Sequence, residues 1–284
     1  MTTILHTRAE LGEAMARRSG STALVPTMGA LHEGHASLMR LARERVGSGP
    51  VVVSVFVNPL QFGVGEDLAR YPRTLDSDVD LCTRLGVDLV FAPGVEEVYP
   101  DGESQVTVAP GPLGGVLEGR SRPGHFEGVL TVVAKLFGLV GPQVAVFGEK
   151  DYQQLALVRR MVRDLNFGIE VIGAPTVREP DGLAMSSRNG LLTPAGRRAA
   201  GALHRGLVAA REHAAAGGDG ATVLAAAHAV LSAEPGVDLD YLQLTDPALQ
   251  PLTEQTGAGV GARVLIAARI GSTRLIDNLA IEFG

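Results

Sequence analysis

The sequence is poor in cysteine and in aromatic residues: its 284 residues include one cysteine, no tryptophan and 4% aromatic side chains. With Cys82 alone, no disulfide can form within the chain, and we expect a cytoplasmic protein because this usage suits a reducing compartment. The few aromatic side chains argue against a platform on which nucleic-acid bases stack. Basic residues form no tract beyond local pairs and the formal net charge is −6, so we expect no nucleic-acid partner.

Long hydrophobic runs are also absent. No apolar run approaches the roughly 18 residues that a membrane span needs, so we expect no membrane partner. The first residues carry charges too early and too often for a signal peptide. These absences leave a small molecule, or a second copy of the chain, as the expected partner.

The remaining composition, 45% hydrophobic and 20% charged, is typical of a globular protein with a sizeable core. Nearly continuous apolar runs predict strands that are covered on both faces, as in a parallel sheet. Helix-like stretches alternate with these runs, which predicts βαβ units and an open parallel sheet of the α/β class. The strand-like runs are residues 21–27, 50–59, 87–93, 143–148 and 169–176, and the helix-like stretches are residues 35–46, 75–85, 125–140 and 151–165.

The last third of the chain has a different pattern. Residues 194–234 are rich in alanine and helix-like, with a break at residues 217–220, and three stretches with some apolar–polar alternation follow them. Helices followed by such strands predict a small α+β domain. We therefore place the two domains at residues 1–176 and 177–284.

The stretch "PTMGALHEGH" places two glycines and two histidines between a predicted strand and a predicted helix. Gly29 permits a tight turn, and Gly34 lies where the helix would begin, where backbone N–H groups and the helix dipole suit a phosphate. His32 and His35 are three residues apart, so they share one face of a helical turn and can both donate to phosphate oxygens. A helix cap with two surface histidines is the alternative interpretation. A zinc site fits less well, because the spacing is not H-E-x-x-H and no cysteine cluster supplies further ligands.

Two further stretches offer groups that suit a phosphate-rich ligand. Ser186, Ser187 and Arg188, in "AMSSRNG", supply two hydroxyls and a guanidinium in a row. Lys150 follows "VFGE" at the end of a predicted strand, where its charge could neutralise a phosphate. An ordinary surface loop and a solvated lysine are the alternatives. Other nucleotide signatures are absent: there is no G-x-x-x-x-G-K-[ST], and "GVGEDL" after Phe62 lacks the third glycine of a dinucleotide loop.

These motifs together resemble the pantothenate synthetase family, whose members are nucleotidyltransferases with a His-x-Gly-His signature and a Lys-Met-Ser-Lys-Ser-type loop. The matching stretches "PTMGALHEGH", "VVSVFVNPLQFG", "YPRT", "SRPGHFEGVLTVV", "FGEKDYQQL" and "PTVREPDGLAMSSRN" occur in the family's order and cover most of residues 24–195. The resemblance implies a Rossmann-like domain with a smaller α+β C-terminal lid domain, a homodimer and a Mg²⁺ requirement. It also implies an activity: ATP-dependent joining of pantoate to β-alanine through pantoyl adenylate, with release of pyrophosphate and AMP.

The resemblance also implies roles for residues. His32 and His35 match the phosphate-contacting pair, Lys150 would neutralise phosphates during transfer, and the Ser186–Ser187–Arg188 run would hold the triphosphate. The full set expected at ATP is Met28, Gly29, Ala30, Leu31, His32, Glu33, Gly34, His35, Gly148, Glu149, Lys150, Asp151, Val177, Met185, Ser186, Ser187 and Arg188.

For pantoate, Gln61 and Gln154 match the family's binding pair, since amides both donate to and accept from hydroxyls. Apolar side chains at matching positions would hold the methyl groups, and Asn58, Tyr71, Arg122 and His125 lie in matching motifs. The apolar positions are Pro26, Met28, Phe56, Val132 and Val133. The acidic cluster "LDSDVD" has Ser77 where a relative can carry an acid. Asp78 is the metal candidate there, unless Mg²⁺ is held chiefly by the phosphates of ATP.

Two other functions remain open at this stage. One is a different adenylyl-transferring enzyme of the same superfamily, such as a cofactor adenylyltransferase or a fragment of a tRNA synthetase. The other is a nucleotide-binding protein without catalysis, against which the intact set of His32, His35, Lys150 and Arg188 argues.

Overall fold

A computed structural model describes residues 2–63, 67–102 and 104–284. Part of the "GVGEDL" stretch, residues 64–66, therefore lies outside the described residues. The chain divides into two compact units. The first comprises Met1–Glu149 and Gln153–Pro175, and the second comprises Lys150–Tyr152 and Thr176–Gly284.

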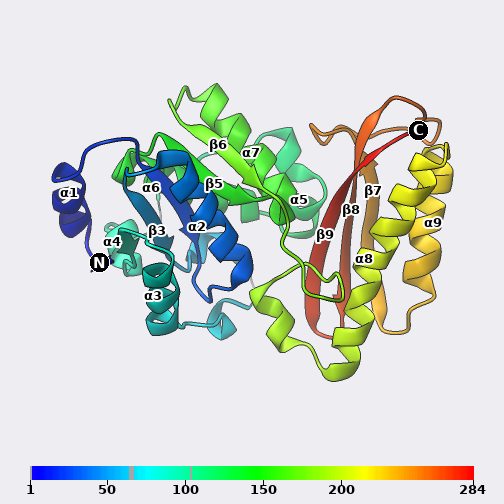
Figure 1. The fold of residues 1–284 in the computed structure, drawn as a ribbon, viewed down its shortest axis with the longest axis horizontal. Coiled ribbons are helices and arrows are strands. Elements are labelled where there is room, and N and C mark those ends of the chain that lie inside the picture. The colour runs from blue at the N-terminus through cyan, green and yellow to red at the C-terminus, as the bar shows by residue number, and fades with distance from the viewer. Residues whose placement is uncertain (1, 64–66, 103) are drawn as a thin grey trace. The chain divides into compact units, whose positions relative to one another are not determined.

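The first unit contains a six-stranded sheet in the order β1-β4-β3-β2-β5-β6. Figure 1 labels β3, β5 and β6 of this sheet. All of its neighbouring strands pair in parallel, which confirms the predicted Rossmann-like α/β class. The strands are β1 (Thr3–Leu5), β2 (Ala23–Thr27), β3 (Val51–Val55), β4 (Leu89–Phe91), β5 (Val144–Gly148) and β6 (Glu170–Ala174). The central strands are buried nearly throughout, as their continuous apolar runs predicted.

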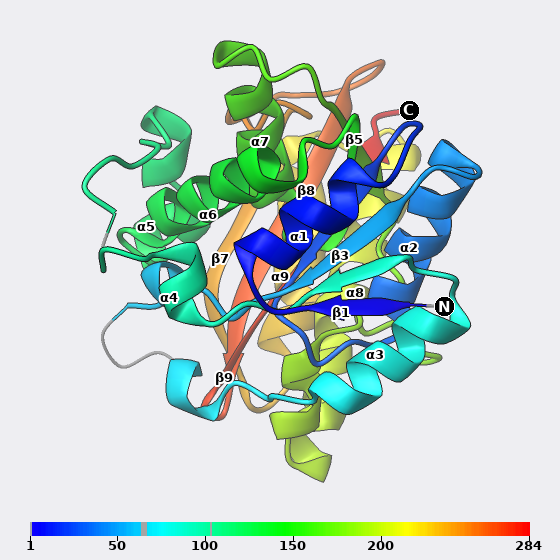
Figure 2. The ribbon, with the colours of Figure 1, turned by 90° about the vertical axis from the view of Figure 1, so that its left-hand side faces the viewer.

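Helices cover both faces of this sheet (Figure 2). The helix α2 packs against β2, β3 and β5 and contacts α3, whereas α1 contacts α6, which packs against β2. The α-helices are α1 (Arg8–Ala16), α2 (Glu33–Val46), α3 (Leu75–Arg84), α4 (Val95–Val98), α5 (Glu118–Ser121), α6 (His125–Val140) and α7 (Tyr152–Asp164), and the 3₁₀ turns are η1 (Pro59–Gln61), η2 (Asp67–Arg70), η3 (Pro112–Gly115) and η4 (Glu149–Asp151).

The strand order reverses between β2 and β5. From β2 the chain continues to β3 on one side, while β5 pairs with the other side of β2. Ligands of open α/β sheets bind beyond the carboxyl ends of the strands at such a switch point. The chain leaves β2 at Thr27 and reaches the His-x-Gly-His motif through the turn at residues 28–31, and it leaves β5 at Gly148, directly before Glu149.

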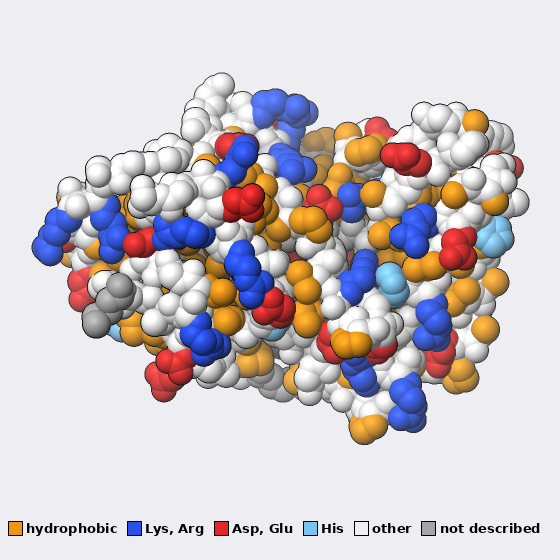
Figure 3. All heavy atoms as spheres, viewed as in Figure 1, with side chains coloured by type: hydrophobic (Ala, Val, Ile, Leu, Met, Phe, Trp, Pro, Cys, Tyr) orange, Lys and Arg blue, Asp and Glu red, His pale blue; other side chains and the backbone are white. Residues whose placement is uncertain are grey.

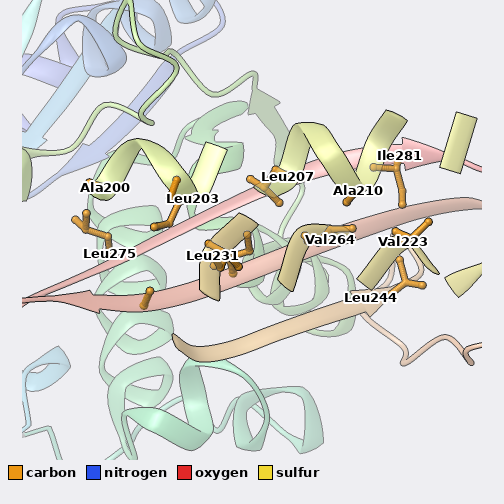
Figure 4. Close-up of a cluster of buried hydrophobic side chains, with 14 of the residues drawn as sticks. Ala200, Leu203, Leu207, Ala210, Val223, Leu231, Leu244, Val264, Leu275 and Ile281 are labelled. Atoms are coloured by element: carbon orange, nitrogen blue, oxygen red, sulfur yellow. The ribbon is translucent and has the colours of Figure 1, made fainter. Parts of the chain in front are cut away.

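The second unit is an α+β structure, as predicted. Its strands β7 (Val237–Thr245), β8 (Gly261–Ile270) and β9 (Thr273–Glu282) form an antiparallel sheet. The helices α8 (Pro194–Ala215) and α9 (Gly220–Ser232) pack on that sheet, and their core includes Leu203, Leu207 and Val264 (Figure 4). The break between the helices contains Gly217 at a φ of +86° and the helix cap Asp219, which accounts for the predicted interruption. A 3₁₀ turn, η5 (Ser187–Leu191), precedes α8.

The main additions to the predicted elements lie at the N-terminus. The strand β1 is three residues long, and the sequence pattern did not indicate it. The helix α1 follows a capping box in which Thr7 accepts from the Glu10 N–H and the Glu10 carboxylate accepts from the Thr7 N–H.

In the part of the chain that the structure describes, no helix has the length and apolarity needed to span a bilayer. On the face shown in Figure 3, Lys and Arg side chains lie among Asp and Glu side chains.

Candidate active site

The turn after β2 is held by a carboxylate from α3. Both oxygens of Asp78 accept backbone N–H groups, from Ala30 at 3.0 Å and from Leu31 at 2.8 Å, and the Thr74 hydroxyl lies 3.2 Å from Oδ1. Gly29 has a φ of +81°, and a Cβ there would lie 3.0 Å from Asp78 Oδ2. Glycine is therefore needed at this position both for the backbone conformation and for the approach of the carboxylate.

The two histidines lie at the start of α2 with their rings 4.1 Å apart. His32 is the N-cap, and its Nδ1 accepts from the Gly34 N–H at 3.1 Å. The Nδ1 of His35 accepts from the His32 N–H at 3.3 Å. A backbone N–H can only donate, so each neutral imidazole carries its proton on Nε2. This tautomer places two ring N–H donors beside a helix N-terminus, which is an arrangement that suits an anion.

Gln61 is joined to the same turn. Its Nε2 lies 3.0 Å from the Met28 sulfur, so a predicted pantoate residue contacts the predicted ATP stretch. Its backbone carbonyl accepts from His125 Nδ1 at 2.8 Å and from the Arg122 guanidinium at 3.3 Å. The "SRPGH" motif therefore holds the main chain at Gln61.

Asn58 and the apolar residues predicted at pantoate surround this position. Asn58 is 1% exposed, its Nδ2 donates to Gln61 Oε1 at 3.2 Å, and its Oδ1 accepts from the Tyr99 hydroxyl at 2.7 Å. Burial raises the pKa of the Tyr99 phenol well above its usual range, so the hydroxyl is a neutral donor. The side chains of Phe56, Val132 and Val133 are buried, whereas Pro26, Met28 and Gln154 are partly exposed.

A glycine allows α6 to approach this network. A Cβ on Gly128 would lie 2.2 Å from the Leu60 carbonyl oxygen, which no side chain can do without displacing the backbone. The Gly128 carbonyl also accepts from Asn58 Nδ2 at 3.1 Å. Gly128 therefore lets α6 hold the η1 turn that carries Gln61.

Lys150 belongs to the second unit, which the predicted domain ranges did not anticipate. Its carbonyl accepts from Asn278 Nδ2 at 2.9 Å, and Asn278 Oδ1 accepts from the buried Arg263 guanidinium. Arg263 also stacks on the Tyr152 ring, with its Cζ 3.6 Å from the centroid. The Lys150 Nζ is 3.8 Å from Asp151 Oδ1. Side chains of β8 and β9 therefore fix the backbone that carries the lysine.

Gly148 and Glu149, also predicted at ATP, end β5 and begin η4, and the predicted residues from Val177 to Arg188 lie between β6 and α8. The Met185 N–H donates to the Val177 carbonyl at 3.0 Å, which brings these two positions together. Ser186 caps η5 by accepting from the Arg188 N–H at 3.3 Å. Asn189 ties the loop to Glu179 at 2.7 Å. Within the second unit, Val177, Met185 and Ser186 thus lie in one loop whose two sides are joined by backbone hydrogen bonds.

A protein-built metal site is not apparent. Among residues 2–63, 67–102 and 104–284, no group of three or more His, Cys, Asp or Glu side chains is placed to hold a metal ion. The Asp78 carboxylate is engaged by backbone N–H groups, so its role at a metal stays a prediction without support from its contacts.

Sequence reasoning missed three residues that organise the site. They are Tyr99, Gly128 and Asn278, each of which contacts a predicted site residue that is distant in the chain. Nothing in the sequence singled out Gln153 either, the neighbour of the predicted pantoate residue Gln154. Gln153 is buried, and its amide bonds to the Leu113 and Val116 carbonyls and to the Glu118 N–H, so it holds residues 113–118. Gly128 lies within the "SRPGHFEGVLTVV" stretch, whereas Tyr99 lies outside the quoted stretches, and no local pattern indicates the partners of either residue.

Known proteins with similar sequences belong to one family. A model of the family described as pantoate-beta-alanine ligase matches residues 2–280. A protein from Nocardioides sp. named pantothenate synthetase is 62% identical over 288 residues, covering 99% of this chain and 86% of that protein. One of the same name from Salinispora arenicola is 56% identical, covering 99% of this chain and 98% of that protein.

Solved structures of the same family superpose on this chain. The crystal structure of pantothenate synthetase from Thermus thermophilus superposes with a TM-score of 0.91 at 55% identity, covering 97% of this chain and 98% of that chain. Pantoate-beta-alanine ligase from Francisella tularensis, crystallised with beta-gamma ATP and beta-alanine, gives a TM-score of 0.81 at 33% identity, covering 98% of this chain and 97% of that chain. The chain therefore belongs to the pantoate-beta-alanine ligase family.

Proposed function

We propose that this protein condenses pantoate with β-alanine at the expense of ATP, and that it does so through pantoyl adenylate. The observation that carries the proposal is the arrangement after β2, where two Nε2–H imidazoles stand at a helix N-terminus and Met28 contacts Gln61. Family membership supports the same reaction. The Francisella tularensis relative was crystallised with a form of ATP and with β-alanine, the two substrates other than pantoate.

In the first step, a pantoate carboxylate oxygen attacks the α-phosphorus of ATP. The new O–P bond forms as the bond to the bridging oxygen breaks, and pyrophosphate leaves with that electron pair. Negative charge builds on the phosphate oxygens, so fixed donors at those oxygens lower the barrier. His32 and His35 supply such donors from Nε2, and Lys150, Ser186, Ser187 and Arg188 supply the others.

Gln61 and Gln154 bind pantoate in this proposal. Their amides hydrogen-bond its hydroxyl and carboxylate oxygens, and the apolar side chains near Gln61 hold the two methyl groups. Phe56, Val132 and Val133 are the buried members of that apolar set.

In the second step, the neutral amine of β-alanine attacks the acyl carbon and AMP leaves with the electrons of the acyl–oxygen bond. The attacking nitrogen releases one proton to solvent as the amide forms. The acyl adenylate is reactive, so positioning of the amine and exclusion of water are the main requirements. We assign the second requirement to the C-terminal unit as a lid.

Three further features of the proposal rest on family resemblance. Mg²⁺ accompanies ATP and supplies charge neutralisation at its phosphates, the protein forms a homodimer, and it works in the cytoplasm.

The test of this function is pyrophosphate–ATP exchange with Mg²⁺, in the presence and absence of pantoate and without β-alanine. Exchange that depends on pantoate supports the adenylate step, and added β-alanine should convert it to net AMP release. Transfer of AMP to another acceptor, with pantoate ignored, would instead favour a different adenylyltransferase. Tight ATP binding with no turnover would favour a protein without catalysis.

A further inference from the structure

We infer that Tyr99 is a positioning residue for the pantoate step: through Asn58 it orients the Gln61 amide so that the donor end of that amide meets the substrate. The inference rests on the proposed function and adds to it a residue that lies outside the predicted site. It also assigns Gln61 the role of a donor, where its amide alone could either donate or accept.

Two backbone groups determine which end of the Asn58 amide is the oxygen, and the Tyr99 hydroxyl holds that oxygen in place. Its Oδ1 accepts from the Leu60 N–H at 3.3 Å, and a backbone N–H cannot accept. Its Nδ2 donates to the Gly128 carbonyl at 3.1 Å, and a carbonyl cannot donate. Both contacts would be lost if the amide were turned over, and Asn58 is 1% exposed, so water could not replace them.

Tyr99 adds the third contact to this amide. Its hydroxyl lies 2.7 Å from Asn58 Oδ1, so it is the donor. The ring is held on two sides, with its centroid 6.2 Å from that of Phe56 and 5.5 Å from the Lys135 Nζ. The position of the hydroxyl is therefore set by packing, and the Asn58 carbonyl oxygen is held by two donors at once.

The fixed Asn58 amide in turn orients Gln61. Asn58 Nδ2 donates to Gln61 Oε1 at 3.2 Å, which turns the oxygen of Gln61 toward Asn58 and its nitrogen away from it. That nitrogen lies 3.0 Å from the Met28 sulfur, which is a weak acceptor. A hydroxyl or carboxylate oxygen of pantoate is a stronger acceptor and can take over this N–H.

The main chain of Gln61 is held independently by His125 and Arg122. Loss of the Tyr99 hydroxyl should therefore loosen the side-chain amide without moving the backbone. We expect Tyr99→Phe to raise the pantoate KM about three- to tenfold, the effect of one neutral hydrogen bond, and to leave kcat within about twofold.

The decisive experiment is a double-mutant cycle with Tyr99→Phe and Gln61→Ala, read out as pantoate KM and kcat in pyrophosphate exchange. We expect Tyr99→Phe to raise KM in the native background and to have no effect on KM in the Gln61→Ala background. Tyr241→Phe, a buried tyrosine of the second unit, is the matched control and should leave KM unchanged. An unchanged KM for Tyr99→Phe, or the same factor in both backgrounds, would overturn the inference.

A second measurement tests the orientation without pantoate. The side-chain amide ¹⁵N–¹H resonances of Gln61, assigned by their loss in Gln61→Ala, should shift in Tyr99→Phe and stay in place in Tyr241→Phe. Resonances that are unmoved by Tyr99→Phe would refute the orientation of Gln61. Native protein that forms neither pyrophosphate nor AMP from pantoate and ATP, with or without β-alanine, would refute the proposed function, and a shifted Gln61 amide in the same protein would leave the orientation supported.

Discussion

Replacement of Asp78 by asparagine should disable the turn after β2 even though the side chain hardly changes shape. In the native protein both carboxylate oxygens accept a backbone N–H, from Ala30 and from Leu31. Asparagine keeps one oxygen and presents an NH₂ group to the other backbone N–H, so one charge-assisted hydrogen bond is lost and two donors face each other. Hydrogen bonds to charged groups contribute about 1.5–3 kcal/mol each. The same turn holds Ala30 at a φ of +50°, a conformation that costs a residue with a Cβ about 1–2 kcal/mol and needs that support.

A loss of this size in the turn that carries His32 and His35 corresponds to a decrease of about 10- to 150-fold in kcat/KM for ATP. The assay is pyrophosphate exchange over a range of ATP and Mg²⁺ concentrations. The matched control is Asp80→Asn, an exposed acid of the same helix, which should stay within about twofold of the native protein.

The Mg²⁺ series separates this account from a metal-binding role. If Asp78 positions the turn, the ratio of variant to native activity is the same at every Mg²⁺ concentration. If it binds the metal, high Mg²⁺ restores activity. Recovery at high Mg²⁺, or near-native kcat/KM at ordinary Mg²⁺, would refute the positioning role.

Three other predictions follow from the structure. Gly128→Ala should lower the free energy of unfolding by roughly 1–3 kcal/mol and raise the pantoate KM, because its Cβ would overlap the Leu60 carbonyl. The control Gly138→Ala, in the same helix, meets no atom within 4 Å and should stabilise the protein by about 0.5–1 kcal/mol. Equal denaturation curves for the two variants would contradict the close approach at Gly128. Cys82 should resist thiol reagents at pH 8, since burial chiefly, and the Asp78 charge, raise its pKa to about 12. The contribution of this protonated thiol to the free energy of unfolding is complete below the unfolded pKa of 9.0 and declines as pH rises toward 12. Rapid labelling of Cys82 in the native protein at pH 8 would contradict the predicted resistance. Lys150→Ala should slow pyrophosphate exchange by about 10²-fold or more, and near-normal exchange would remove its role.

Most of the fold is encoded locally, which is why the sequence predicted it. The strands β2, β3 and β5 are buried on both faces, so their apolar runs are continuous, and α6 spans the predicted residues 125–140. The break between α8 and α9 carries its own turn and cap residues. In contrast, β1 has three residues and exists because it pairs with β4 more than eighty residues later, and no local period records such a pairing.

The candidate site divides in the same way. The motif residues His32, His35 and Gln61 could be named from the sequence, and the structure joins them through the turn at Met28. The contacts that hold them come from afar: Asp78 reaches Ala30 across 48 positions, and Tyr99 reaches Asn58 across 41. An acid in a cluster after "YPRT" suggests a metal ligand, and no local pattern indicates that its oxygens accept the backbone N–H groups of a distant turn.

The membership of Lys150 in the second unit was equally inaccessible. Its backbone is bonded to Asn278, which lies 128 positions later, and Tyr152 donates to the Pro247 carbonyl at 2.9 Å. In sequence, the three residues 150–152 are a continuous part of the first domain. Only the tertiary contacts assign them to the second unit.

The most direct test of the central claim is the dependence of pyrophosphate–ATP exchange on pantoate, measured with Mg²⁺ and without β-alanine. The account predicts exchange only when pantoate is present, and its conversion to net AMP release when β-alanine is added. If no exchange is seen, the assay is repeated with both pantoate and β-alanine, because the first step can require bound β-alanine. A folded, ATP-binding protein that forms neither pyrophosphate nor AMP under both conditions would contradict the account.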